Sequence, residues 1–233
     1  MISVIIPTLN SDKSLAATLT ALIPAVVGGL IRDVIIADGG SVDRTLSIAD
    51  QSGADIVNSA PGRGLQLRAG AATAKMPWLL FLHADTVLEP GWEREADALI
   101  DRITDGGSPD QAASFRFRLD DSRFAARLIE VGVELRSSVL RLPYGDQGLL
   151  ISRALYSSVG GFADMPIMED IDLIRRIGRN RVRMLNARAT TSAVRYQSEG
   201  YFKRVLRNQR CLLLYLTGAS PDRVARVYNR PGS

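Results

Sequence analysis

The 233-residue sequence contains one cysteine, Cys211, and one histidine, His83. A single cysteine excludes an intrachain disulfide and any metal site built from clustered cysteines. Long apolar runs are also missing, since none approaches the roughly 18 to 20 residues needed to cross a bilayer. The apolar start at 2–6 is short, is broken by Pro7 and lacks the basic flank of a secretory signal. We therefore expect a protein of the reducing cytoplasm, with peripheral contact at the inner membrane face as the alternative location.

The charge balance is mildly basic. Lysine and arginine together number 29 against 25 acidic residues, which gives a net charge of +4. Most of the basic residues are arginines, whose planar fork suits phosphates and carboxylates. The excess is too small for a nucleic-acid coat and indicates an anionic small ligand instead. We expect no nucleic-acid partner, and the sequence does not indicate the oligomeric state.

The first hundred residues alternate between β-branched runs and segments of helical period. The expected strands are 2–7, 32–38, 54–58 and 77–85, and the expected helices are 12–26, 41–48 and 65–74. Continuous apolar strands that alternate with helices indicate a parallel sheet covered on both faces.

Residues beyond 105 are less regular. We expect a loop at 106–111, an exposed strand at 112–121, a helix at 122–140, a strand at 148–152, a loop entering a helix within 160–180, two short strands at 181–186 and 189–194, and a basic amphipathic helix from Tyr201. With no repeat or linker, the interpretation is a single domain over 1–233, with a nucleotide-binding half at 1–105 and an acceptor-facing half at 106–233.

Polar residues follow each strand of the first half. Pro7, Thr8 and Asn10 follow the first, Asp38 the second, Arg63 and Gly64 the third, and His83 and Asp85 the fourth. Ligands of open parallel sheets bind beyond the carboxyl ends of the strands. We therefore expect these residues to gather at one rim of the sheet.

Each of these positions has a structural alternative. The Asp38 carboxylate can accept hydrogen bonds from a ribose hydroxyl or a base N–H, and it can equally accept them from the N–H groups of its own turn.

His83 and Asp85 lie two residues apart, so on a strand both side chains face one ligand. A carboxylate with phosphate oxygens suits Mg²⁺ or Mn²⁺, and the alternative is that Asp85 caps a turn while His83 is a rim residue. The Arg63 turn suits phosphate or is a plain strand-to-helix turn, and no Gly-x-Gly-x-x-Gly follows the first strand, which disfavours a Rossmann oxidoreductase.

Two helical segments carry clustered charge. Glu169, Asp170 and Asp172 open a predicted helix, where the helix dipole favours acids, and a general base would also be at home there. In the C-terminal helix we expect a solvated basic face over a packed apolar face, with membrane-surface or phosphate contact as the minority interpretation. The residues concerned are Lys203, Arg204, Arg207 and Arg210 beside Leu206, Leu212, Leu213 and Leu216.

The ordered segments "VIIPTLN", "VIIADGGSVDRT", "FLHADT" and "MEDIDLIRR" resemble the motifs of glycosyltransferase family 2, the GT-A nucleotide-sugar transferases. "GRGLQLRAGA", "FLHADT" and "YGDQG" resemble a small bacterial subgroup of stand-alone enzymes in which HAD replaces the DXD motif. The resemblance implies an α/β GT-A fold with a Rossmann-like, mainly parallel sheet. It also implies an inverting transfer from a UDP- or GDP-sugar to an unknown acceptor hydroxyl.

The resemblance assigns roles residue by residue. It implies that Pro7, Thr8 and Asn10 line the base and ribose pocket, that Asp38 contacts the nucleoside, and that Arg63 and Gly64 lie near the base or diphosphate. Asp85 would hold Mn²⁺ or Mg²⁺, and His83, in place of the first DXD acid, would contact donor or metal or leave the ion to Asp85 alone. Asp170 would be the catalytic base, with Glu169 as the second choice.

Two rival functions stay open at this level. A sugar-phosphate nucleotidyltransferase needs a Gly-rich turn with Arg and Lys after the first strand, and "PTLNSDKS" lacks it. A non-catalytic module would bind anionic lipid or a partner protein through the basic C-terminal helix. The QxxRW element of processive synthases is absent, which favours single addition over polymer synthesis.

Overall fold

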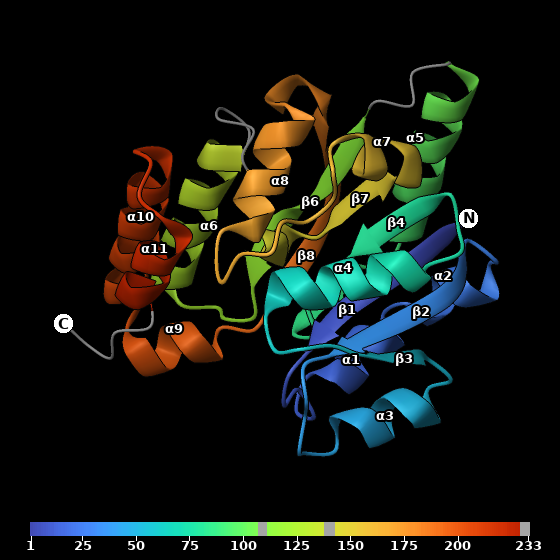
Figure 1. Cartoon of the computed structure of the whole chain (residues 1–233), viewed down its shortest axis with the longest axis horizontal. Helices are drawn as coiled ribbons and strands as arrows, with labels where there is room; N and C mark the ends of the chain where they lie inside the picture. The colour runs from blue at the N-terminus through green and yellow to red at the C-terminus, as the bar shows by residue number, and fades with distance from the viewer. Residues whose placement is uncertain (107–110, 138–142, 229–233) are drawn as a thin grey trace.

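The computed structural model describes residues 1–106, 111–137 and 143–228. Within these ranges one eight-stranded sheet in the order β3-β2-β1-β4-β7-β6-β8-β5 is flanked by helices (Figure 1). The strands are β1 (Ile2–Thr8), β2 (Ile31–Asp38), β3 (Asp55–Asn58), β4 (Trp78–Phe81), β5 (Thr86–Leu88), β6 (Ala112–Leu119), β7 (Leu149–Ser152) and β8 (Val182–Thr191). The helices are α1 (Leu15–Thr20), α2 (Ile23–Val27), α3 (Thr45–Gln51), α4 (Arg63–Thr73), α5 (Trp92–Asp105), α6 (Phe124–Leu135), α7 (Arg153–Ser158), α8 (Glu169–Ile177), α9 (Val194–Glu199), α10 (Tyr201–Leu216) and α11 (Pro221–Tyr228), with 3-10 turns η2 (Gly145–Gln147) and η3 (Arg179–Arg181).

The first half folds as its β-branched runs predict. β1 pairs in parallel with both β2 and β4, and β2 pairs in parallel with β3. The helix expected over 12–26 is divided into α1 and α2, because Pro24 lacks an N–H and opens the first turn of a new helix. The helix expected from Ser41 begins at Thr45, since the preceding residues form a hydrogen-bonded turn.

The second half makes the sheet mixed and corrects two expectations. β6 is not an exposed strand, because it lies between β7 and β8 and buries Phe115 fully. The two short strands expected at 181–186 and 189–194 are one strand, β8, which pairs with β6 and β5. β5 and α5 were not predicted. Parts of the expected loop at 106–111 and helix at 122–140 lie outside the described residues.

Two apolar layers hold the helices against the sheet. α1, α2, α3 and α5 pack on one face, where Leu15, Leu22 and Trp92 are almost fully buried. α4, α7 and α8 cover the other face through Leu67, Leu155 and other apolar residues. Among the described residues, no helix is both long and apolar enough to cross a membrane.

The first turns of α4 are wedged between the two halves of the chain. Gln66 is buried, and its Nε2 donates hydrogen bonds to the carbonyls of Thr8 (2.6 Å) and Ala37 (2.9 Å), at the ends of β1 and β2. On the other side, a Cβ at Gly64 would lie 2.6 Å from the carbonyl oxygen of Ala163. Such a distance is far below van der Waals contact, so α4 approaches the second half at Gly64 as closely as backbone allows. The helix thereby fixes where Arg63, its first residue, stands relative to both halves.

Candidate active site

A cavity of about 780 Å³, including the part open to solvent, lies between the end of β4 and the C-terminal helices. Four of the sequence-predicted site residues line it: Arg63, His83, Asp85 and Asp170. They come from α4, from the turn after β4 and from α8, which are far apart in the sequence. Of the residues expected to gather at the rim of the sheet, Arg63, His83 and Asp85 line this cavity, and their roles stay a prediction.

His83 and Asp85 stand in a turn and not on a strand as expected. β4 ends at Phe81, and the amide of Thr86 donates to the carbonyl of His83 as the chain turns into β5. Both side chains are half-buried and line the same cavity. They share one environment because the turn brings them there, and not through the alternation of a strand.

Arg63 connects His83 to Glu169. Its Nη1 lies 3.3 Å from Nε2 of His83, and its Nε lies 2.5 Å from Oε1 of Glu169. Burial lowers the pKa of His83 well below its ordinary value, and the positive charges of Arg63 and Arg195 lower it further. The imidazole is therefore neutral at neutral pH. Because a guanidinium can only donate, Nε2 accepts from Arg63 and the ring proton sits on Nδ1.

Glu169 is committed to this ion pair. Its side chain is 1% exposed, and burial raises the pKa of its carboxyl against the opposing attraction of Arg63. It does not line the cavity that holds Asp170 and Asp85. The geometry therefore favours Asp170 over Glu169 as a base that meets a substrate.

Asp170 is held by two backbone amides and still has room to accept. Its Oδ2 accepts from the amide of Gly145 at 2.7 Å, and its Oδ1 accepts from the amide of Ile171 at 2.8 Å. Each carboxylate oxygen has two lone pairs, so an acceptor position is left on both. A Cβ at Gly145 would lie 2.8 Å from Nε2 of His83 and 3.3 Å from Oδ2 of Asp170, which explains a glycine there.

The same cavity can be tested for a divalent ion. Among the described residues no group of three or more His, Cys, Asp or Glu side chains could hold a metal. A one-carboxylate site fits, because Mg²⁺ and Mn²⁺ are commonly held by one or two carboxylates together with substrate phosphates. Asp85 meets that requirement, because its carboxylate makes no hydrogen bond or ion pair with the described residues. His83 fits less well, since its Nε2 already faces the guanidinium of Arg63.

The loops after β1 and β2 form a separate polar cluster away from this cavity. The Asp38 carboxylate is buried and accepts from the hydroxyl of Thr8, the amide of Gly40 and both the amide and hydroxyl of Ser41. Burial raises the pKa of Asp38, but these hydrogen bonds outweigh it, so the net pKa lies below the ordinary value. The contacts that the turn interpretation requires are thus present, and they leave the nucleoside role of Asp38 as a prediction.

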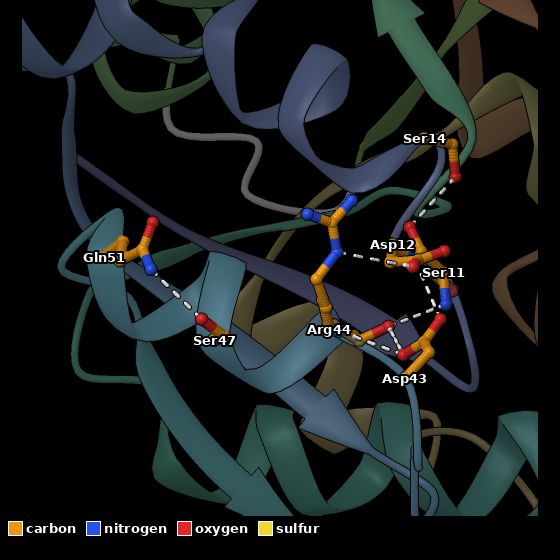
Figure 2. Close-up of polar contacts among 8 residues, drawn as sticks. Ser11, Asp12, Ser14, Asp43, Arg44, Ser47 and Gln51 are labelled. Atoms are coloured by element: carbon orange, nitrogen blue, oxygen red, sulfur yellow. Dashed lines mark hydrogen bonds and ion pairs between the residues drawn. The ribbon is translucent and has the colours of Figure 1, made fainter.

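The same two loops are joined further out. Asn10 has a φ of 51°, its amide donates to the hydroxyl of Ser41, and its Oδ1 accepts from the amide of Val42 at 3.0 Å. Figure 2 shows the next contacts, in which the amide of Asp12 donates to Asp43 and Arg44 lies 3.9 Å from the Asp12 carboxylate. This cross-bracing fixes the shape of the loops in the segment that the family motifs assign to the nucleotide.

Asp146 in the segment "YGDQG" was not predicted as a site residue. It lines the cavity with Asp170, and its Oδ1 is buried without a hydrogen-bond partner. Tyr144 of the same segment also lines the cavity, and Arg136 lies 3.3 Å from the centre of its ring. The available signal was an acid in the short segment from Gly145 to Gly148, but only the fold shows that it lines the same cavity as Asp170.

Because the carboxyl of Asp146 is buried, we expect the free energy of unfolding of the metal-free protein to depend on pH. Burial raises the pKa of its carboxyl from 3.8 to about 6, with Asp170 and Asp85 adding to the shift and Arg136 opposing it. Because the folded-state pKa is raised, the penalty for ionising Asp146 is absent below pH 4, grows between pH 4 and 6, and is constant above. Asp146→Asn should therefore exceed the wild type in unfolding free energy by about 1 to 2 kcal/mol at pH 7.5, and by nearly nothing at pH 4. Urea unfolding with EDTA at both pH values measures this, and a pH-independent difference would contradict it.

Comparisons with known proteins agree with this architecture. Residues 3–123 match the family described as Glycosyl transferase family 2. An uncharacterised glycosyltransferase of Mycobacterium bovis is 34% identical over 91 residues, which span 39% of this chain and 39% of that relative. A PGL/p-HBAD biosynthesis glycosyltransferase of the same species is 35% identical over 112 residues, covering 42% of this chain and 39% of its own length. The matched segments thus span about two fifths of these curated relatives.

Solved structures show the same fold. The crystal structure of glucosyl-3-phosphoglycerate synthase from Mycobacterium tuberculosis with Mn²⁺, UDP and glucosyl-3-phosphoglycerate superposes with a TM-score of 0.59 at 22% identity, over 94% of this chain and 80% of that one. The same enzyme with Mn²⁺, UDP-glucose and phosphoglyceric acid gives 0.54 at 23% identity, over 80% and 69%. The mixed sheet with its flanking helices is therefore a GT-A fold. Since the family match covers more than half of its residues, the chain belongs to glycosyl transferase family 2.

Proposed function

We propose that the protein transfers a sugar from a nucleoside diphosphate sugar to an acceptor hydroxyl, with inversion at the anomeric carbon and Asp170 as general base. The observation that supports this most is that Asp170 lines the same cavity as Asp85 and Arg63. A general base must lie within hydrogen-bond reach of the proton that it removes. Asp170 offers acceptor positions towards the cavity, whereas Glu169 is held by Arg63.

The donor would lie across the first half of the chain, at 1–105. The cross-braced loops with Pro7, Thr8, Asn10 and Asp38 would receive the base and ribose, and Arg63 and Gly64 would stand near the diphosphate. A divalent ion held by Asp85 would offset the negative charge of the departing diphosphate. The Mn²⁺ and UDP found in the M. tuberculosis synthase support a UDP-sugar and a divalent ion for this chain.

The neutral His83 would then contact the donor and not the ion. Its Nδ1 carries a proton and its Nε2 accepts from Arg63, so the ring can donate one hydrogen bond to a sugar or phosphate oxygen. The second half, 106–233, would supply the acceptor site, because α8, α9, α10 and the η2 segment form the far wall of the cavity.

Donor turnover tests the proposal directly. With Mn²⁺, we expect the full chain to release UDP or GDP slowly from one sugar nucleotide of a panel, by transfer to water. The same donor should raise the unfolding temperature, since a ligand at 100 times its Kd stabilises the folded state by about 2.7 kcal/mol. A nucleotidyltransferase would instead form pyrophosphate from a nucleoside triphosphate and a sugar phosphate. A binding module would release nothing, and either result would contradict the proposal.

A further inference from the structure

The outward faces of α6 and α10 are apolar. On α6 the exposed apolar side chains are 57% to 77% accessible and recur at helical spacing: Phe124, Leu128, Val131 and Leu135. On α10 they are 41% to 79% accessible and recur in the same way: Phe202, Leu206, Leu213 and Leu216. Such stripes normally face a core, and large exposed apolar patches mark interaction sites.

This arrangement reverses the face expected for the C-terminal helix. We expected its leucines to pack inward under a solvated basic face, but Leu206, Leu213 and Leu216 are exposed. Arg204 is buried instead, and both Arg204 and Arg207 pair with Glu199. The inward side of α10 buries Arg204, Cys211 and Leu212, and Val205, Leu214 and Tyr215 are partly buried against neighbouring apolar clusters. The helix therefore presents leucine, and not mainly arginine, to its surroundings.

A groove runs between the two stripes. α6 and α10 lie side by side at the C-terminal end of the molecule (Figure 1), and a cavity of about 1020 Å³, including its open part, separates them. Half-buried Ile129, Val133 and Val205 line it, with the exposed Leu128 and Phe202 at its rims. Its apolar lining suits an aliphatic chain.

The groove is continuous with the candidate active site. Four residues line both the groove and the cavity of Asp170: Tyr144, Asp146, Tyr196 and Asn208. A molecule whose apolar part fills the groove can therefore place its polar end beside the proposed base. This continuity identifies the groove as part of the acceptor site.

Two basic side chains border the apolar stripe of α10 and favour an anionic bilayer as the source of such a molecule. Lys203 and Arg210 are exposed beside the stripe, and within the described part of the chain no carboxylate is recorded as their partner. Cations that border an apolar helix face are typical of helices that lie in the interface of an anionic bilayer. A bilayer would cover both stripes and supply its lipids at the mouth of the groove.

We propose that the α6–α10 groove holds the apolar chain of a lipid acceptor, which enters from a bilayer on which the two stripes rest. The proposal rests on the proposed function, since it names the acceptor class of that site. In the reaction the lipid hydroxyl oxygen bonds to the anomeric carbon while the bond from that carbon to the diphosphate oxygen breaks. The hydroxyl proton passes to Asp170, and the nucleoside diphosphate leaves with the bonding electrons.

Gly132 gives a clean test of the groove. It lines the groove on α6, and a Cβ there would meet no atom within 4 Å, so a larger residue fits the helix without a clash. We expect wild type to bind the fluorescent 18-carbon chain of cis-parinaric acid saturably. Gly132→Phe should bind it at least about tenfold more weakly, since the phenyl ring occupies the apolar volume, whereas Gly132→Ala should bind as wild type. No saturable binding by wild type, or equal binding by Gly132→Phe, would overturn the proposal.

Vesicle flotation tests the stripes. We expect the full chain to float with phosphatidylcholine vesicles that contain 30% phosphatidylglycerol, and less with phosphatidylcholine alone. Leu206→Ser with Leu213→Ser should lower the floated fraction at least about fivefold, because two apolar contacts with the bilayer are lost. The matched control is Val26→Ser with Val27→Ser, which alters two exposed valines on α2 at the other end of the molecule and should float as wild type.

Two outcomes of the flotation experiment would overturn the proposal: equal flotation of both double variants, or a wild type that stays at the bottom and forms a dimer by light scattering that the leucine variant does not. Neither experiment uses a sugar nucleotide. A chain-binding protein without donor turnover would therefore contradict the proposed function alone, and donor turnover without chain binding would contradict this inference alone.

Discussion

Asp170→Asn is expected to lower the rate of sugar transfer by about 10² to 10⁴, the usual contribution of a positioned general base. The carboxylate lines the cavity and keeps acceptor positions free beside its bonds to the amides of Gly145 and Ile171. An Asn amide nitrogen cannot accept a proton, so the acceptor hydroxyl would attack without a base. Donor affinity should stay close to that of wild type, because the proposed donor contacts lie in the first half of the chain and do not include Asp170.

The control for this variant lies on the same helix. Asp172 pairs with Arg176 and with the hydroxyl of Tyr215, and it does not line the cavity. Asp172→Asn should therefore transfer sugar at nearly the wild-type rate. Initial rates with donor and acceptor, and calorimetric titration with donor alone, separate the two effects. Near wild-type transfer by Asp170→Asn would place the base elsewhere.

Asp85→Ala is expected to weaken the metal-dependent part of donor affinity at least about tenfold, because outer contacts alone change metal affinity 10- to 100-fold and Asp85 is the proposed direct ligand. The folded state should tolerate the change, since this carboxylate makes no hydrogen bond or ion pair with the described residues. Titration calorimetry of the donor with Mn²⁺ and with EDTA measures the metal-dependent part as a difference between two Kd values.

Asp120→Asn is the matched control for Asp85. Both acids line a second cavity near β5, and Asp120 is exposed. If the loss of one negative charge in this region were the cause, both variants would lower the Mn²⁺-dependent donor affinity alike. If Asp85 binds the metal, only Asp85→Ala should lower it. Unchanged Mn²⁺-dependent affinity in Asp85→Ala would remove that residue from the metal site.

The sequence predicted the strands of the first half and their parallel arrangement. These strands are mostly apolar runs that alternate with helices, and β1, β2, β3 and β4 pair in parallel. It did not predict the place of β6, because its pairing partners on β7 and β8 lie 37 to 72 residues further along the chain. Alternating burial alone cannot distinguish an edge strand from a strand between two others.

The candidate site shows the same division. Arg63, His83, Asp85 and Asp170 were predicted from motifs and strand ends, and they line one cavity. Asp146 was missed because its importance depends on the approach of η2 to α8, a contact between distant segments. The exposed leucines of α10 were misplaced because an amphipathic pattern shows that a helix has two faces but not which face is covered.

The wedge formed by the first turns of α4 has a consequence for how the two substrates meet. Gln66 anchors this helix to the ends of β1 and β2, and Gly64 sets it against the carbonyl of Ala163. The loops proposed to bind the nucleotide and the segment that leads into α8 thus both pack against the same helix, α4. Under the proposed function, the separation between the donor loops and Asp170 is set when the chain folds, so the entropy of aligning them is lost before either substrate binds.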